Sequence, residues 1–408
     1  MRLLLISLDG LWEEDIHALE RLPYIGALIR MGTLCKNVQT IYPALTYPVH
    51  TTILTGCYPN QHGIAHNQPF SPDTSIKNRK WYWEASQIKR PTMHQLIHEK
   101  GGTTASILWP VTGKNPYIRW NFPEVLALPH ENQTLKMLQY GSAPWILAME
   151  LLYGKQRKGI HQPDLDDYAA LLAEKLILSK RPPDFLTLHL VDCDEMRHLY
   201  GVRSKEASQA IARLDERVGR LMTALDRKQL GKDTIVALVS DHGLADISKT
   251  VSLEQALAEA GFIGMCKAQS TGMGAYLHFN RATTEQINNV KSFLLQKKEE
   301  LGISHIYDAD DLISMGAGRG IYLAVEAMPG VVFVDELEHK KREKATHGFG
   351  PGHSASRCLF AIAGPGIRKG AVISSANMVD IAPTLMSAIG HTMSSAQGRI
   401  VVECFENG

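Results

Sequence analysis

The chain has 408 residues, with 43 Lys and Arg against 42 Asp and Glu, giving a formal net charge of +1 at pH 7. This balance, without long runs of like charge, provides no broad electrostatic surface for duplex nucleic acid or an anionic membrane, so we expect neither as a partner. The length exceeds what one hydrophobic core usually serves, which predicts one large domain with a smaller one inserted or appended. A small charged ligand remains compatible with the composition.

The N-terminal stretch MRLLLISLDG is interpreted as a first buried strand rather than a signal peptide, because Asp9 interrupts its apolar run. Other apolar runs are far shorter than the ~20 residues that span a bilayer. The six cysteines are dispersed without a CxxC pair, which favours reduced thiols over disulfides or cysteine-bound zinc. Together these features predict a cytoplasmic protein that does not associate with membranes.

Strand-like apolar runs recur along the chain and alternate with amphipathic helical patterns. The helical patterns cover 91–101 and 204–225, where apolar residues recur at intervals of three and four. This alternation predicts an α/β fold with a mostly parallel central sheet and helices on both of its faces. The predicted strands, in chain order, are 2–8, 104–109, 184–191, 234–240 and 358–364.

Two stretches interrupt the alternation. Residues about 110–165 are expected to form a loop-and-helix insertion, in which the apolar segment 147–154 fits either a subunit interface or buried packing. Residues 251–345 contain helical patterns around the strand-like GAYLHF, which predict a small α+β lid. The catalytic core would then comprise 1–250 and 346–408. The sequence does not specify the oligomeric state.

Acidic and imidazole side chains follow the first, third and fourth predicted strands. Asp9 follows the first, Asp192 and Asp194 follow the third, and Asp241 with His242 follows the fourth. The carboxyl ends of parallel strands meet at one edge of the sheet, where such folds place their active sites. We therefore expect these side chains to gather at that edge.

Carboxylates and imidazoles together are suitable ligands for Zn²⁺ or Mn²⁺. Asp194 and His198 lie four residues apart, which places both on one face if a helix follows the strand. His347, in THGFGPGH, is a further candidate near the last core strand. From the residues alone, Asp192 is an alternative to Asp194 and His353 to His347, although the four-residue spacing to His198 favours Asp194.

A short helix is predicted between Thr46 and Gly56, with the threonine at its opening. A threonine hydroxyl is a poor nucleophile unless a base or a metal lowers its pKa, so a metal cluster nearby would give this position a chemical role. The neighbouring His50 and His62 are interpreted as local hydrogen-bonding residues. His66 is a candidate for lining the pocket.

These motifs together resemble the alkaline phosphatase superfamily, and within it the nucleotide pyrophosphatase/phosphodiesterase branch. They occur in the family's order over almost the whole chain, whereas the two insertions carry no match. The resemblance therefore implies an alkaline phosphatase-like core. The matching segments are ISLDG (6–10), LTYPVHTTILTGCYPNQHGIAHN (45–67), DCDEMRH (192–198), SDHG (240–243), THGF (346–349) and VDIAPTLMSAIG (379–390).

The resemblance also implies two zinc ions, with Mn²⁺ as an alternative metal. The implied ligands of one ion are Asp194, His198 and His347. The implied ligands of the other are Asp9, Asp241, His242 and the nucleophile Thr46. Asn67 is implied to donate a hydrogen bond to a phosphoryl oxygen.

The favoured function is a metal-dependent hydrolase that cleaves phosphodiester or pyrophosphate bonds of a small phosphoester, with nucleotides as one candidate, through a phosphorylated Thr46. The threonine, and the lack of a recognisable phosphate-clamping arginine, favour a diester over a monoester. Alternatives are a phosphomonoesterase, a phosphonate hydrolase, a phosphomutase or a non-catalytic zinc-stabilised binding protein. The aromatic run 81–83 and Trp109 either line a base pocket or pack in the core.

Overall fold

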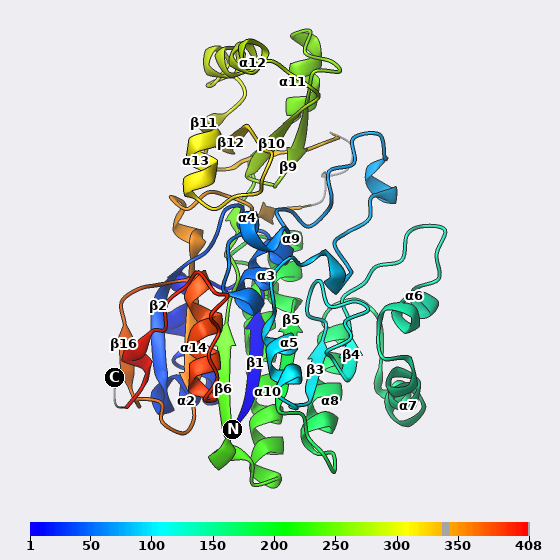
Figure 1. Ribbon diagram of the computed structural model, residues 1–408, viewed down its shortest axis with the longest axis vertical. Coiled ribbons are helices and arrows are strands. Elements are labelled where there is room, and N and C mark those ends of the chain that lie inside the picture. The colour runs from blue at the N-terminus through cyan, green and yellow to red at the C-terminus, as the bar shows by residue number, and fades with distance from the viewer. Residues whose placement is uncertain (337–342, 407–408) are drawn as a thin grey trace.

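The computed structural model describes residues 1–336 and 343–406, and its largest element is a nine-stranded sheet (Figure 1). The five strands predicted for the core lie in this sheet, whereas the predicted strand GAYLHF lies in a separate one. The strands of the nine-stranded sheet are β1 (Arg2–Leu8), β2 (Thr33–Gln39), β3 (Thr104–Ile107), β4 (Trp120–Phe122), β5 (Phe185–Leu190), β6 (Thr234–Val239), β15 (Arg357–Ala363), β16 (Ala371–Ile373) and β17 (Ala376–Asn377).

The order across the sheet is β16-β2-β15-β6-β1-β5-β3-β4, and β17 also pairs with β2. From β6 to β4 all neighbours run parallel, whereas β15 is antiparallel to both β6 and β2. The predicted α/β class with a mostly parallel sheet is therefore confirmed. The sequence analysis missed β2, because polar residues interrupt its apolar pattern TLCKNVQ.

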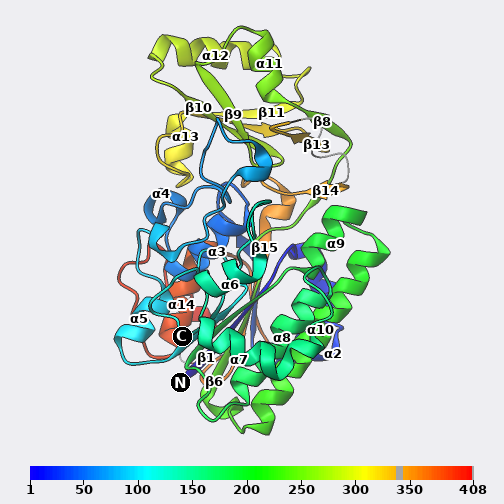
Figure 2. The same ribbon diagram turned by 90° about the vertical axis from the view of Figure 1, so that its right-hand side faces the viewer.

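Helices cover both faces of the sheet, as predicted, and Figure 2 shows the two layers on opposite sides of the strands. Side chains of β1 alternate between them: Leu4 and Ile6 pack into one hydrophobic cluster, and Leu3 and Leu5 into the other. One layer contains α1 (Ile16–Leu19), α2 (Pro23–Met31), α8 (Asp164–Ile177) and α10 (Lys205–Arg227). The other contains α3 (Thr46–Thr55), α5 (Met93–Glu99) and α14 (Ile381–Ala388).

A four-stranded antiparallel sheet, ordered β11-β12-β10-β9, stands apart from the main sheet at the top of Figure 1. It falls within the segment 251–345 predicted to form a lid, of which 337–342 lie outside the described residues. Its apolar face packs against α11 and α12. The elements here are α11 (Leu253–Glu259), β9 (Cys266–Ser270), β10 (Gly274–Phe279), α12 (Thr284–Gln296), β11 (Ile303–Tyr307), α13 (Ala309–Ser314) and β12 (Leu323–Ala327).

Short elements complete the described chain. Within 110–165, two helices follow β4. No helix in residues 1–336 and 343–406 has both the length and the apolar character that a membrane crossing requires. The remaining elements are α4 (Pro59–His62), α6 (Gln133–Tyr140), α7 (Ala143–Tyr153), α9 (Asp192–Tyr200), β7 (Ala245–Asp246) paired with β14 (Ala345–Thr346), and β8 (Lys249–Val251) paired with β13 (Val331–Phe333).

A buried arginine fixes the start of α9, the helix that follows β5. The guanidinium of Arg217, on α10, is only 1% exposed and donates to Asp192 at 2.7 Å and to Asp167 at 2.8 Å. Asp192 also accepts from Arg213, and Asp166 accepts the backbone N–H of Asp192 at 2.9 Å. This network ties α8, α9 and α10 together, and it engages both oxygens of Asp192 in ion pairs.

We predict that Arg217→Met lowers the free energy of unfolding by about 3 kcal/mol or more, because it removes the cation paired with the buried Asp166 and one of the two arginines paired with the buried Asp192. Arg220→Met, on the same helix, removes an ion pair with Glu174 whose arginine side chain is 40% exposed, and should cost less than about 1 kcal/mol. Urea denaturation of both variants measures the difference. Equal losses would show that the buried network does not stabilise the fold.

Candidate active site

The carboxyl ends of β6, β1 and β5 are adjacent and gather the acidic side chains that follow these strands. Asp9 donates its backbone N–H to the carbonyl of Leu190 at 2.9 Å, so the end of β1 is held against the end of β5. Gly10 has a φ of +76°, and a Cβ there would lie 2.9 Å from the Cα of Asp194. A glycine is therefore needed for Asp9 to come this close to α9.

Two groups of buried side chains in the described part of the chain each bring their ligand atoms within 4.8 Å of one another. One group is Asp9, Asp241 and His242, and the other is Asp194, His242 and His347. His242 belongs to both: its Nε2 lies 3.1 Å from Asp241 Oδ2 and 3.7 Å from Asp9 Oδ1, and its ring stacks on that of His347. The two groups therefore form one continuous cluster.

His198 lies at the edge of this cluster, on the same helix as Asp194, as the four-residue spacing predicted. Its Nε2 is 3.4 Å from Asp194 Oδ2, and its Nδ1 donates to the carbonyl of Ala345 at 2.8 Å. His347 likewise donates its Nδ1–H to the carbonyl of Ala44 at 2.9 Å. In the neutral form of each residue this bond leaves Nε2 as the unprotonated nitrogen, which is the usual arrangement for a metal-binding histidine.

The carboxylates of the cluster are buried close together, which disfavours their charged forms unless a cation lies among them. Burial and the charge of Asp194 raise the pKa of Asp9 to about 6, and burial together with Asp9 raises the pKa of Asp241 well above its usual value. Burial and the neighbouring His347 lower the pKa of His242. The following buried atoms make no hydrogen bond to any residue that the structure describes: Asp9 Oδ1, Asp194 Oδ1, Asp241 Oδ2 and His242 Nδ1.

Buried polar atoms without partners are rare in native proteins, because leaving them unsatisfied is costly. Here they sit among carboxylates that repel one another, so divalent cations would satisfy the vacant acceptors and offset the repulsion together. The mixture of oxygen and nitrogen donors suits Zn²⁺ or Mn²⁺. The residues present therefore fit the metal ions that the sequence motifs imply.

Thr46 is the first residue of α3, and its Oγ1 lies 3.3 Å from Nε2 of His242. The N–H of Tyr47, in the same first turn, donates to Oδ1 of Asn67 at 3.0 Å. Asn67 thus caps α3 from a distant loop, and this use of its oxygen leaves its amide N–H groups free to donate to a ligand. Both the helix start and the amide favour an anion beside the threonine.

A pocket of about 390 Å³ opens beside this helix start, and Asn67, His198 and His347 line it. We call it the catalytic pocket. Trp81 also lines it and meets the ring of Tyr47 edge to face at 5.1 Å. Trp109, in contrast, is fully buried and donates its indole N–H to the carbonyl of His50 at 3.4 Å. Trp81 therefore lines the pocket, whereas Trp109 packs in the core.

The sequence analysis missed the residues that hold Asp9. His189, on β5, contacts Asp9 Oδ2 through Nε2 at 2.9 Å and Glu124 Oε2 through Nδ1 at 3.1 Å. Burial opposes protonation of His189, but its hydrogen bonds to the two carboxylates outweigh burial and raise its pKa. Glu124 also accepts from the hydroxyl of Tyr47 at 3.2 Å. An imidazole inside the apolar strand FLTLHL was the available signal for His189.

His50 and His353 make local hydrogen bonds, although His50 Nδ1 also lies 3.7 Å from Asp241 Oδ2 of the ligand cluster. His50 donates to the carbonyl of Thr46 at 2.8 Å and contacts Ser7, in keeping with the local role expected of it. His353 accepts the N–H of Ala355 and stacks on Phe349. Since His353 and Asp192 are both engaged elsewhere, the geometry favours His347 and Asp194 over these two alternatives.

The model of the type I phosphodiesterase / nucleotide pyrophosphatase family matches residues 3–349. The chain belongs to this family. The membership confirms the resemblance seen in the motifs and agrees with the gathering of these motifs at one edge of the sheet.

Relatives and solved structures support the same assignment. Human ectonucleotide pyrophosphatase/phosphodiesterase family member 1 is 29% identical over 256 residues, which cover 59% of this chain and 23% of that protein. Bis(5'-adenosyl)-triphosphatase ENPP4 of Pongo abelii is 23% identical over 409 residues, covering 95% of this chain and 78% of that protein. The structure of human ectonucleotide pyrophosphatase/phosphodiesterase 5 superposes with a TM-score of 0.73 at 18% identity, covering 100% of both chains. The chain spans only about a quarter of the family member 1 sequences that it matches.

The dual role of Asn67 can be separated by two substitutions. Asn67→Ala removes both the helix cap and the amide donor, so we predict a loss of about 1 kcal/mol in unfolding free energy together with reduced turnover. Asn67→Asp keeps the capping oxygen but loses the donor, so stability should be retained while turnover still falls. Thermal unfolding measures the change in stability, and steady-state kinetics measures the change in turnover. Wild-type turnover in the aspartate variant would exclude the amide as a ligand donor.

Proposed function

We propose that the protein is a metal-dependent hydrolase of phosphodiester or pyrophosphate bonds, acting on small substrates of the nucleotide class. The observation that carries the proposal is the position of Thr46 at a helix N-terminus, 3.3 Å from His242 of the ligand cluster. One metal ion would be held by Asp194, His198 and His347. The other would be held by Asp9, Asp241, His242 and Thr46. Zn²⁺ is the preferred ion and Mn²⁺ the alternative.

The bound ions would supply Lewis-acid stabilisation of the phosphoryl charge and a lowered pKa for the nucleophile. Thr46 Oγ1 attacks phosphorus, forming a phosphothreonine ester while the bond to the leaving oxygen breaks. Water then hydrolyses this ester and restores the threonine. The Asn67 amide donates to a phosphoryl oxygen, the positive end of α3 favours the anion, and His189 with Glu124 holds Asp9 in place.

Two findings from the relatives support this assignment. A murine ectonucleotide pyrophosphatase/phosphodiesterase 5 structure, with a TM-score of 0.72, is of an inactive variant in which alanine replaces a threonine, in complex with AMP. The relative from Pongo abelii is named as a bis(5'-adenosyl)-triphosphatase, which cleaves a dinucleotide. The first finding fits a threonine nucleophile, and both fit a nucleotide substrate.

The lining of the catalytic pocket favours a diester. Among the described residues this lining contains no lysine or arginine, so nothing but the metal ions would neutralise the second charge of a monoester. A phosphomonoesterase, a phosphonate hydrolase and a phosphomutase remain the alternatives within the same chemistry. A non-catalytic binding protein would have no use for the threonine at this position. The cytoplasmic location stays a prediction from the sequence.

Substrate comparison with a nucleophile variant tests the proposal. Zn²⁺-loaded protein should hydrolyse bis-nitrophenyl phosphate and a nucleoside 5′-monophosphate nitrophenyl ester with a higher kcat/KM than nitrophenyl phosphate. Thr46→Ala should lower kcat by about 10³-fold or more, because it removes the attacking oxygen, whereas Thr46→Ser should keep substantial activity. Full metal-dependent turnover by the alanine variant would rule out the covalent step. A higher kcat/KM for nitrophenyl phosphate than for the two diesters would favour a phosphomonoesterase instead.

Metal removal tests the ligand cluster separately from catalysis. Without cations the carboxylates of Asp9, Asp194 and Asp241 repel one another in a buried site, so a chelator should lower Tm by several degrees and abolish turnover. Adding back Zn²⁺ should restore both. Asp241→Asn, which removes one carboxylate charge, should reduce the Tm gain on adding Zn²⁺. An unchanged Tm and activity after exhaustive chelation would contradict the metal assignment.

A further inference from the structure

A buried arginine lies between two implied metal ligands on α9. Arg197 is only 3% exposed, and Asp194 and His198, which are implied to hold one ion, flank it on this helix. Its guanidinium donates to the two carboxylate oxygens of Asp15, at 2.9 and 2.6 Å, and to the carbonyl of Gly10. Gly10 directly follows a ligand that is implied for the other ion. The arginine therefore joins the helix of one ligand group to the loop that begins the other.

The indole of Trp12 lies against this ion pair and against the loop after β6. The guanidinium carbon of Arg197 is 4.3 Å from the ring centroid of Trp12, which is a cation–π contact, and the backbone N–H of Trp12 donates to Asp15 Oδ2 at 3.1 Å. Gly243 directly follows His242, and a Cβ at Gly243 would lie 2.5 Å from the indole, so only glycine allows this approach. Trp12 thus packs the loop after β1 against the loop that carries the shared histidine. We call Arg197 and Trp12 the supporting pair.

The two remaining ligand segments also reach Trp12. Its ring belongs to a small buried hydrophobic cluster that includes Ala44 and Phe349. Ala44 lies two residues before Thr46, and Phe349 lies two residues after His347. Every segment that carries an implied metal ligand therefore has a residue that contacts the supporting pair or shares this cluster with it.

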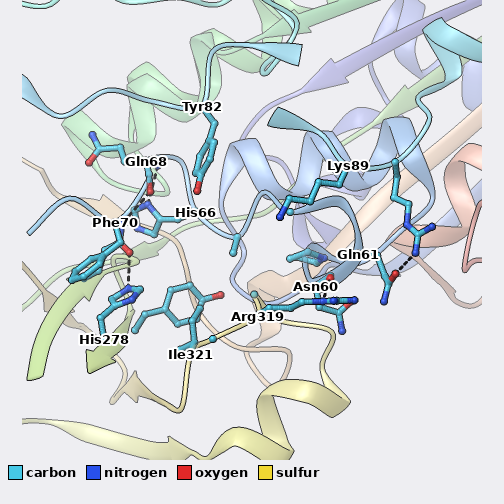
Figure 3. Close-up of a pocket in the computed structure, with 18 residues that line it drawn as sticks. Asn60, Gln61, His66, Gln68, Phe70, Tyr82, Lys89, His278, Arg319 and Ile321 are labelled. Atoms are coloured by element: carbon cyan, nitrogen blue, oxygen red, sulfur yellow. Dashed lines mark hydrogen bonds between the residues drawn. The ribbon is translucent and has the colours of Figure 1, made fainter. Parts of the chain in front are cut away.

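The supporting pair lines neither of the two pockets near the site. The catalytic pocket contains neither residue, and a second pocket of about 430 Å³, between α4 and the β9–β10 part of the small sheet, does not contain them either (Figure 3). The cations that line this second pocket are Lys89, Arg90 and Arg319. Because the pair is buried and outside both pockets, it would act on the reaction only through the ligands that it holds.

The partners of Arg197 distinguish it from Arg217, the other fully buried arginine described above. Arg217 pairs with Asp166 and Asp192, which stand apart from the ligand set. Arg197 instead bonds to the backbone beside a ligand, and Asp15 balances its charge. One buried arginine thus joins helices of the fold, whereas the other joins the two ligand groups.

We propose that Arg197 and Trp12 are positioning residues that set the distance between the two metal positions. The inference rests on the proposed function, since it takes both ligand groups to hold an ion. Arg197 holds α9 against the loop after β1, and Trp12 holds that loop against the loop after β6. Two-metal phosphoryl transfer depends on this distance, because the ions stabilise the attacking and the leaving oxygen together. A shift of either segment therefore lowers kcat without changing the contacts of the substrate with the pocket.

The test loads the full chain with Mn²⁺ and records its EPR spectrum, in which two ions held close together show magnetic coupling. Arg197→Lys keeps the positive charge but loses the planar fork that reaches Asp15 and Gly10 together. This variant should weaken the coupling and lower the affinity for the second ion, measured by calorimetry, about tenfold or more. Its kcat for bis-nitrophenyl phosphate should fall by a similar factor at an unchanged KM. Trp12→Phe, which keeps the ion pair between Arg197 and Asp15, should give the same changes to a smaller extent.

Asp215→Asn is the matched control. Asp215 is a buried carboxylate that caps α2 by accepting the N–H groups of Tyr24 and Ile25, and α2 carries no implied ligand. The control should lower Tm but leave the coupling, the affinity for the second ion and kcat unchanged. If Arg197→Lys does not fold, Trp12→Phe supplies the same measurements.

Failure of the inference and failure of the proposed function give different results. A lower Tm with unchanged coupling, affinity for the second ion and kcat, or equal changes in the control, would leave the supporting pair a purely structural role and overturn the inference. If the unaltered protein binds two ions but hydrolyses no phosphoester, the proposed function fails, while the coupling and the affinities still decide the spacing role. If the unaltered protein binds fewer than two ions, both fail together.

Discussion

The burial of mutually repelling carboxylates at one edge of the sheet is the constraint on which the rest of the structure depends. Asp9, Asp194 and Asp241 are nearly inaccessible to solvent, and each has an oxygen without a hydrogen-bond partner among the described residues. Such a cluster is unfavourable by itself, since charged groups lose their hydration on burial. Divalent cations bound here would offset this repulsion. The carboxylates that would otherwise destabilise the fold would then serve as metal ligands.

Much of this edge could be predicted from sequence because parallel strands place their carboxyl ends together. Asp9, Asp194, Asp241 and His242 each follow a strand or begin the next helix, and the sheet order β6-β1-β5 brings these ends side by side. The pairing of His189 with Glu124 could not be predicted. It joins positions 65 residues apart, and the contact depends on how the loop after β4 returns to the sheet.

The role of Asn67 shows a similar limit. The family motif implied a hydrogen bond to phosphate, but nothing in the sequence indicated that its oxygen also caps the helix of the nucleophile. The pocket of about 430 Å³ between α4 and the β9–β10 part of the small sheet was even less predictable from the sequence. Its cations come from loops before α5 and after α13, and its wall joins the core to the small sheet.

The central claim is that the buried carboxylates and imidazoles form a two-metal site beside Thr46. The most direct measurement is anomalous diffraction at the zinc edge from crystals of the protein grown with Zn²⁺. The account predicts two anomalous peaks, one among Asp194, His198 and His347 and one among Asp9, Asp241 and His242 with Thr46 at its edge. No peak in the cluster, or zinc bound only elsewhere on the surface, would contradict it.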